Sequence, residues 1–142
     1  MIPLAFVVFG AAFGVLAFAP WFAGGPRWAD ATLSGVAGAS ELWSLPVLGA
    51  VLVICGLLIA FKIATGSVVS WTALAAAAMA TLWSLHATVD PPVHVLADHL
   101  GADTGVSLPA SMAPVHLVVA AHLAVAAAAL AALAAVIRLA RA

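Results

Sequence analysis

Charged side chains are scarce in this sequence. They make up 6% of the 142 residues, while hydrophobic residues make up 67%. A soluble domain carries about 25% charged residues, and a fold of this size cannot cover its surface with so few. The scarcity excludes an ordinary water-soluble domain, and we therefore expect an integral membrane protein in contact with the lipid bilayer.

Cysteines and catalytic motifs are nearly absent too. Cys55 is the only cysteine, which excludes an intramolecular disulfide. The chain contains no P-loop, dinucleotide fingerprint or nucleophile motif, so we do not expect an enzyme. Its formal net charge is −1 and it has no basic patch, so we expect no nucleic-acid partner.

Long apolar stretches dominate what remains. A helix needs about 20 such residues to cross a bilayer. Runs such as 124–136 are apolar on every side, and in lipid a helix pairs all its backbone groups within itself. The sequence thus predicts an all-α fold, a single domain over residues 1–142 that forms a four-transmembrane-helix bundle. The helices are expected at about 2–20, 43–63, 68–86 and 113–137.

The positions of the basic residues predict the orientation. Lys62 borders a short connection, and Arg138 and Arg141 follow the fourth helix. Cytoplasmic segments carry an excess of Lys and Arg. We therefore expect a multi-pass protein of the plasma membrane with both termini in the cytoplasm and two extracytoplasmic loops, 21–42 and 87–112.

Tryptophans are enriched where the membrane meets water, because the indole ring is amphipathic. Four of the five tryptophans in the chain lie near the ends of the expected helices. We expect Trp21, Trp43 and Trp83 at the outer interface and Trp71 at the inner one.

Glycines mark expected helix contacts. Gly10 and Gly14 form a GxxxG motif in the first helix, and Gly49 and Gly56 share a face of the second. Small residues let two helix backbones approach closely in lipid. We expect these four glycines to mediate helix packing.

The segment WSLHATVDPPVHVLADH (83–99) is a candidate metal site. Two prolines end the third helix, and 93–101 can then form a short helix on which His94 and Asp98 share a face. A zinc site needs three or four ligands, so His86, Asp90 or Asp103 would have to contribute. The alternative is a solvated loop without a divalent metal.

A second hypothesis concerns a cofactor between helices. His86 ends the third expected helix and His116 begins the fourth, so they could ligate haem b from two sides or hold a quinone. His122 lies about 9 Å deeper at 1.5 Å per residue and needs only a hydrogen-bond partner on a neighbouring helix. The alternative for all three is ordinary packing or contact with a partner subunit.

Pro20–Trp21 and the segment GASELWSLP (38–46) resemble the tryptophan-operon-associated integral membrane proteins of actinobacteria. In that family the first helix ends in Pro-Trp, and a G-S-E-L-x-P-like sequence enters the second helix. The resemblance implies a topology of four helices with a short inner turn. It implies no biochemical role.

The function that these features favour is that of a non-catalytic accessory subunit in a larger membrane protein complex. We expect an energy-transducing assembly of the respiratory, electron-transport type, with other integral membrane subunits as partners. An apolar interior, small-residue packing faces and polar loops on one side support this expectation. Two alternatives remain: a protein that binds haem b, quinone or metal, and a small oligomeric transporter or channel.

Overall fold

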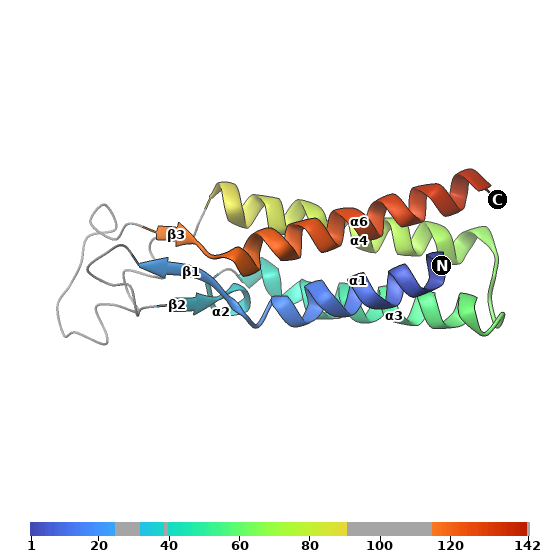
Figure 1. The fold of residues 1–142 in the computed structure, drawn as a ribbon, viewed down its shortest axis with the longest axis horizontal. Helices are drawn as coiled ribbons and strands as arrows, with labels where there is room; N and C mark the ends of the chain where they lie inside the picture. Colours follow the sequence, from blue (N-terminus) through green and yellow to red (C-terminus); the bar gives the residue numbers. More distant parts are fainter. Residues whose placement is uncertain (25–31, 39, 91–114, 142) are drawn as a thin grey trace.

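The computed structural model describes residues 1–24, 32–38, 40–90 and 115–141. Within these ranges, four long helices run side by side along one axis (Figure 1). Both chain termini lie at the same end of this bundle. The long helices are α1 (Ile2–Leu16), α3 (Ser44–Ala60), α4 (Ser67–Val89) and α6 (Val119–Arg141).

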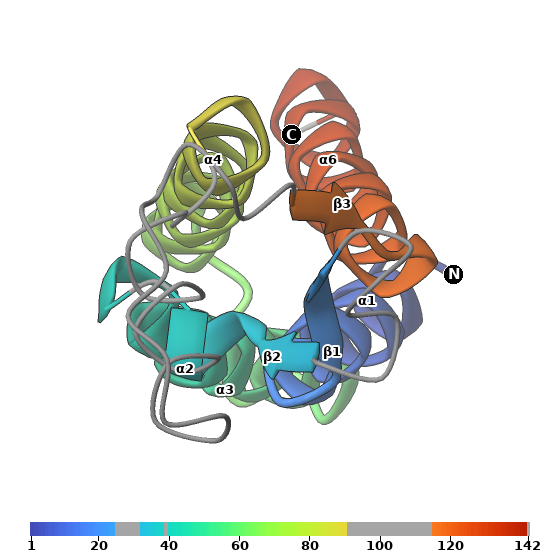
Figure 2. The ribbon, with the colours of Figure 1, turned by 90° about the vertical axis from the view of Figure 1, so that its left-hand side faces the viewer.

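The four helices are arranged in a ring. Viewed along the bundle axis, α1 lies between α3 and α6, and α4 completes the ring between the same two helices (Figure 2). The contact between α1 and α3 is the most extensive of the four, and that between α3 and α4 the least. The ring is therefore packed least extensively where α3 meets α4.

Two of these helices are long and apolar enough to cross a membrane. Helices α4 and α6 have 23 residues each, or roughly 34 Å at 1.5 Å per residue, against a hydrocarbon core of about 30 Å. Helices α1 and α3 are shorter apolar helices of 15 and 17 residues. The four helices were predicted, but their lengths are less uniform than expected.

Helices α4 and α6 pack through small residues. Most of their buried positions recur at alternating steps of three and four, which is the 3.5-residue repeat typical of a left-handed helix pair. Alanine at most of these positions lets the two backbones approach closely. The repeat comprises Ser70, Ala73, Ala77, Ala80, Ser84 and Ala87 on α4, and Ala121, Ala124, Ala128, Ala131 and Ala135 on α6.

A small antiparallel sheet caps the end of the bundle opposite the termini (Figure 1), with strand order β2-β1-β3. Phe22 of β1 pairs with Leu33 on one side and with Leu117 on the other. The four-helix framework agrees with the predicted helical fold, and this short sheet at one end was not predicted. The strands of this sheet are β1 (Pro20–Gly24), β2 (Thr32–Ser34) and β3 (Val115–Leu117). Two short helices follow β2 in the chain, α2 (Gly35–Gly38) and the 3-10 helix η2 (Ser40–Trp43).

Helix α1 ends earlier than predicted. It stops at Leu16 rather than at residue 20, because Pro20 cannot donate a backbone hydrogen bond and biases the residue before it away from helical geometry. Trp21 is fully buried, and its Nε1–H donates to the Leu16 carbonyl oxygen at 2.6 Å. The indole therefore caps the end of α1 inside the protein instead of lying on its surface, and its position at an outer membrane interface stays a prediction.

The other helix ends also differ from the prediction. Helix α4 continues to Val89 and gives way at Asp90, whose backbone is not helical (φ −121°, ψ 76°), as expected before a proline. Helix α6 begins at Val119 rather than at 113 and continues to Arg141. It starts later because 115–117 pair with β1 as strand β3, and Val118 N–H then donates to the Trp21 carbonyl oxygen at 2.8 Å.

Candidate functional site

The glycines lie where α1 and α3 touch. An ideal Cβ on Gly10 would lie 2.9 Å from the Gly49 carbonyl oxygen, and one on Gly49 would lie 2.5 Å from the Gly10 carbonyl oxygen. A Cβ on Gly56 would lie 2.7 Å from the Pro3 carbonyl oxygen. Gly14 differs, since its added Cβ would meet its nearest neighbours at an ordinary 3.7 Å. Three of the four glycines therefore permit a backbone approach that alanine would block.

The premise of the haem and quinone hypothesis fails in part. His86 lies in the last turn of α4 with an exposed side chain. His116 is not on a helix: it lies in β3, where it pairs with Ala23, because this segment completes the sheet. The prediction that two antiparallel helices present these histidines to each other is therefore wrong. Whether either residue binds a ligand stays a prediction.

His122 faces outward from α6. Its side chain is exposed, and Nδ1 lies 3.3 Å from the Val118 carbonyl oxygen of the preceding turn. The expected partner on a neighbouring helix is replaced by this local contact. The imidazole thus sits beside the sheet end rather than inside the bundle.

The metal hypothesis falls largely on residues that the structure does not describe. His94, Asp98 and Asp103 lie outside the described ranges. Within residues 1–24, 32–38, 40–90 and 115–141, no three His, Cys, Asp or Glu side chains come together as a metal site would require. The metal site therefore stays a prediction from the sequence.

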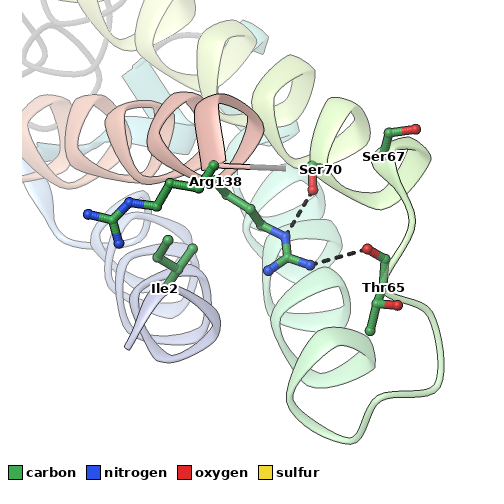
Figure 3. A pocket seen from close by; sticks show the side chains of 6 residues that line it. Ile2, Thr65, Ser67, Ser70 and Arg138 are labelled. Carbon is green, nitrogen blue, oxygen red and sulfur yellow. Dashed lines mark hydrogen bonds between the residues drawn. The ribbon is translucent and has the colours of Figure 1, made fainter.

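The most polar pocket among those described opens at the end where the termini lie. It has a volume of about 360 Å³. Figure 3 shows Arg138 of α6 reaching toward the start of α4, with Ile2 of α1 on the other side. The pocket is lined by Ile2, Thr65, Ser67, Ser70, Arg138 and Arg141.

Hydrogen bonds hold the Arg138 side chain in this pocket (Figure 3). Nε–H donates to Ser70 Oγ at 2.9 Å, and an Nη2–H donates to the Thr65 carbonyl oxygen at 3.3 Å. Ser70 is 2% exposed, so it is a fixed anchor rather than a mobile surface group. Both acceptors are neutral, and none of the residues that line the pocket is acidic. Within the described part of the chain, the guanidinium thus has neutral hydrogen-bond partners and no carboxylate among the residues that line its pocket.

The sequence did not reveal this pocket. Arg138 and Arg141 were noted only for their effect on orientation, and Ser70 lies 68 residues away from Arg138. The repeat of small residues on α4 does contain one sign of the pocket, namely a serine in place of alanine. Ser70 occupies a position of the three-and-four repeat on α4 that alanine fills elsewhere, and a hydroxyl in such a seam favours a polar partner on the facing helix.

Two apolar grooves lie on the outside of the bundle. One, of about 510 Å³, runs along α4 and is lined by Ala75, Ala78, Met79, Leu82, Trp83 and His86. The other, of about 370 Å³, lies between the start of α1 and the end of α6 and includes Leu4, Val8 and Ile137. Ile2 lines this second groove and also the polar pocket. The groove and the pocket are therefore neighbours at the same end of the bundle.

Comparison of the chain with protein-family models, with curated proteins and with solved structures found no match. The resemblance to the tryptophan-operon-associated membrane proteins stays a hypothesis that rests on Pro20–Trp21 and on residues 38–46.

Proposed function

We propose that this chain is a non-catalytic accessory subunit of a larger membrane protein complex. All four long helices would cross the plasma membrane, with both termini in the cytoplasm. The observation that carries the proposal is the groove along the outward face of α4.

Large apolar side chains point outward from every long helix. In water this surface would be costly, at roughly 25 cal/mol for each Å² of apolar area, whereas a lipid environment removes that cost. Helices α1 and α3 are short for a complete crossing, but strand pairing next to α1 and the 3-10 turn η2 before α3 satisfy further backbone groups. Examples of these exposed residues, which are 42–82% exposed, are Leu4, Val15, Ile54, Leu57, Leu82, Val89, Leu123 and Leu133.

Charge supports the proposed orientation. Lys62, Arg138 and Arg141 belong to the end of the bundle that carries both termini, while Asp90 follows α4 at the opposite end. Basic residues favour the cytoplasmic side. Exposed Trp71 near the start of α4 and exposed Trp43 and Trp83 near the other end fit two membrane–water interfaces.

The groove on α4 fits an apolar helix of another subunit. Ala75 and Ala78 are small enough to let a partner backbone come close, as small residues do at helix contacts in lipid. Met79 has a flexible side chain that adapts to an irregular partner surface. His86, exposed at the sheet end of the groove, offers a hydrogen bond that lipid chains cannot return.

Purification in a mild detergent tests this proposal. We expect the wild-type chain to co-purify in stoichiometric amount with other membrane subunits on a native gel, and mass spectrometry then identifies the host complex. Ala75→Leu and Ala78→Leu fill the groove and should release the partner. Ala129→Leu is the matched control, since Ala129 is exposed on α6 and does not line the groove.

A wild-type chain that runs as an isolated monomer, with no other subunit present, contradicts the proposal. Retention of the partner by both groove variants would instead show that α4 is not the docking face. The partner would also be retained if the groove holds lipid and not a protein helix, because the added leucine side chains then remove no protein contact.

A further inference from the structure

We propose that the polar pocket between the ends of α1, α4 and α6 binds a phosphate group, supplied by the headgroup of an anionic phospholipid. The acyl chains of this lipid would lie in the neighbouring groove between α1 and α6. The lipid as the source of the phosphate rests on the membrane location proposed above. The phosphate chemistry rests on the pocket itself.

Positive charge in the pocket comes from arginine, and the Arg138 guanidinium is the group held there by hydrogen bonds. Arg138 and Arg141 both line the pocket, and arginine binds phosphate through parallel N–H donors arranged in a planar fork. Arg138 has five such donors, and the described residues accept hydrogen bonds from its Nε and Nη2 atoms only. The remaining donors are available to a ligand in the pocket.

The start of α4 adds further donors. Ser67 is the first residue of this helix, and the N-cap residue Gly66 provides no side-chain cap. The amides of the first helical turn therefore have no partner from the cap, and the positive end of the helix dipole favours an anion there. Ser67 itself lines the same pocket.

Ser70 acts as a positioning residue. Its buried hydroxyl accepts from Arg138 Nε at 2.9 Å, which fixes the plane of the guanidinium before any ligand arrives. A donor fixed in advance loses less conformational freedom on binding than a free side chain does. Loss of this hydroxyl should therefore weaken binding without removing any charge.

The apolar groove favours a lipid over free phosphate. Ile2 separates the pocket from the groove and lines both. In the groove, Leu4 and Val8 of α1 face Ile137 of α6 with no charged residue among the lining side chains. A headgroup held by arginines next to a channel for hydrocarbon matches a phospholipid, whereas inorganic phosphate makes no use of the groove.

Native mass spectrometry of the full chain tests the proposal. The detergent-purified protein is titrated with phosphatidylglycerol, with phosphatidylcholine of the same chain length, and with inorganic phosphate. We expect preferential retention of phosphatidylglycerol. Arg138→Gln should weaken it by about tenfold, as expected for loss of charge-assisted hydrogen bonds, and Ser70→Ala by a smaller factor.

Lys62→Gln is the matched control, because Lys62 is a basic residue at the same end of the bundle that does not line the pocket. It should change retention less than about twofold, in keeping with the small effect of an exposed charge. Arg138→Lys keeps the charge and shows whether the planar fork matters, so it should bind more weakly than wild type. Thermal unfolding of each variant confirms that it folds.

Three results overturn the proposal: equal binding by wild type and Arg138→Gln, an equal loss in Lys62→Gln, or no preference for phosphatidylglycerol over phosphatidylcholine. Displacement of the lipid by millimolar inorganic phosphate, with the same dependence on Arg138, would keep the phosphate chemistry and overturn the lipid source. Partner release in the Ala75→Leu and Ala78→Leu experiment is a separate readout. If these two variants retain the partner, the docking proposal fails and the phosphate result is unaffected.

Discussion

Gly10 of α1 and Gly49 of α3 bring two helix backbones together, since an ideal Cβ on Gly10 would lie 2.9 Å from the Gly49 carbonyl oxygen. Nothing at this contact can yield easily, because the obstructing oxygen belongs to a helix backbone. The GxxxG motif that begins at Gly10 therefore has a physical role at its first glycine.

Gly10→Ala should lower the free energy of unfolding in detergent by about 1–3 kcal/mol, the usual cost of overpacking a close contact. Gly14→Ala is the control within the same motif, since its Cβ would meet its neighbours at 3.7 Å. It should change stability by no more than about 0.5 kcal/mol. Denaturation in mixed detergent measures both, and equal effects of the two substitutions would contradict the close approach at Gly10.

Replacing each of two buried serines of α4 with alanine should change the stability of the protein in opposite directions. Ser84 Oγ is buried and has no hydrogen-bond partner among the described residues, whereas Ser70 Oγ accepts from Arg138. Ser84→Ala removes an unpaired buried hydroxyl and should raise stability by about 1 kcal/mol, while Ser70→Ala should lower it by about the same amount. Thermal unfolding compares them directly. A clear loss of stability in Ser84→Ala would mean that its hydroxyl is paired.

Replacing Trp21 should destabilise the protein more than replacing a tryptophan on the surface. Trp21→Phe removes the hydrogen bond to the Leu16 carbonyl oxygen and leaves a smaller ring in a fully buried site. We expect a loss of about 1–3 kcal/mol. Trp43→Phe, at a residue 59% exposed, should change stability by less than about 0.5 kcal/mol. The reverse ranking would argue that Trp21 does not cap α1.

The placement of His116 in a strand makes a haem protein an unfavourable alternative. We expect the absorption spectrum of the purified protein to lack a Soret band. If a Soret band is present, His86→Ala and His116→Ala identify the ligands by abolishing it. That result would replace the accessory-subunit proposal with the redox alternative.

The four long helices could be predicted because each is a long, predominantly apolar segment, and in lipid such a segment satisfies its backbone groups by forming a helix. The end of α1 was predictable in principle, since Pro20 cannot continue a helix. The alternating repeat of alanines in α4 and α6 was harder to recognise. Their outward positions are apolar too, so the buried face does not stand out in composition.

The sheet and the polar pocket depend on contacts between distant parts of the chain. Phe22 pairs with Leu117, and strands of three to five residues carry too little pattern to show such a pairing in advance. The same holds for Arg138, whose anchor Ser70 lies on another helix. Local sequence fixes which segments are helical, while the antiparallel packing of α4 on α6 decides which polar groups meet.

Accessibility of single cysteines in intact cells tests the central claim most directly. In a Cys55→Ala background, Gly66→Cys lies at the end of the bundle that carries the termini, and Asp90→Cys lies at the opposite end. A maleimide that cannot cross membranes should label Asp90→Cys in intact cells, and Gly66→Cys only after the membrane is permeabilised. Equal labelling of both positions before permeabilisation, or recovery of the protein in the soluble fraction, would contradict a bundle that crosses the membrane with its basic end inside.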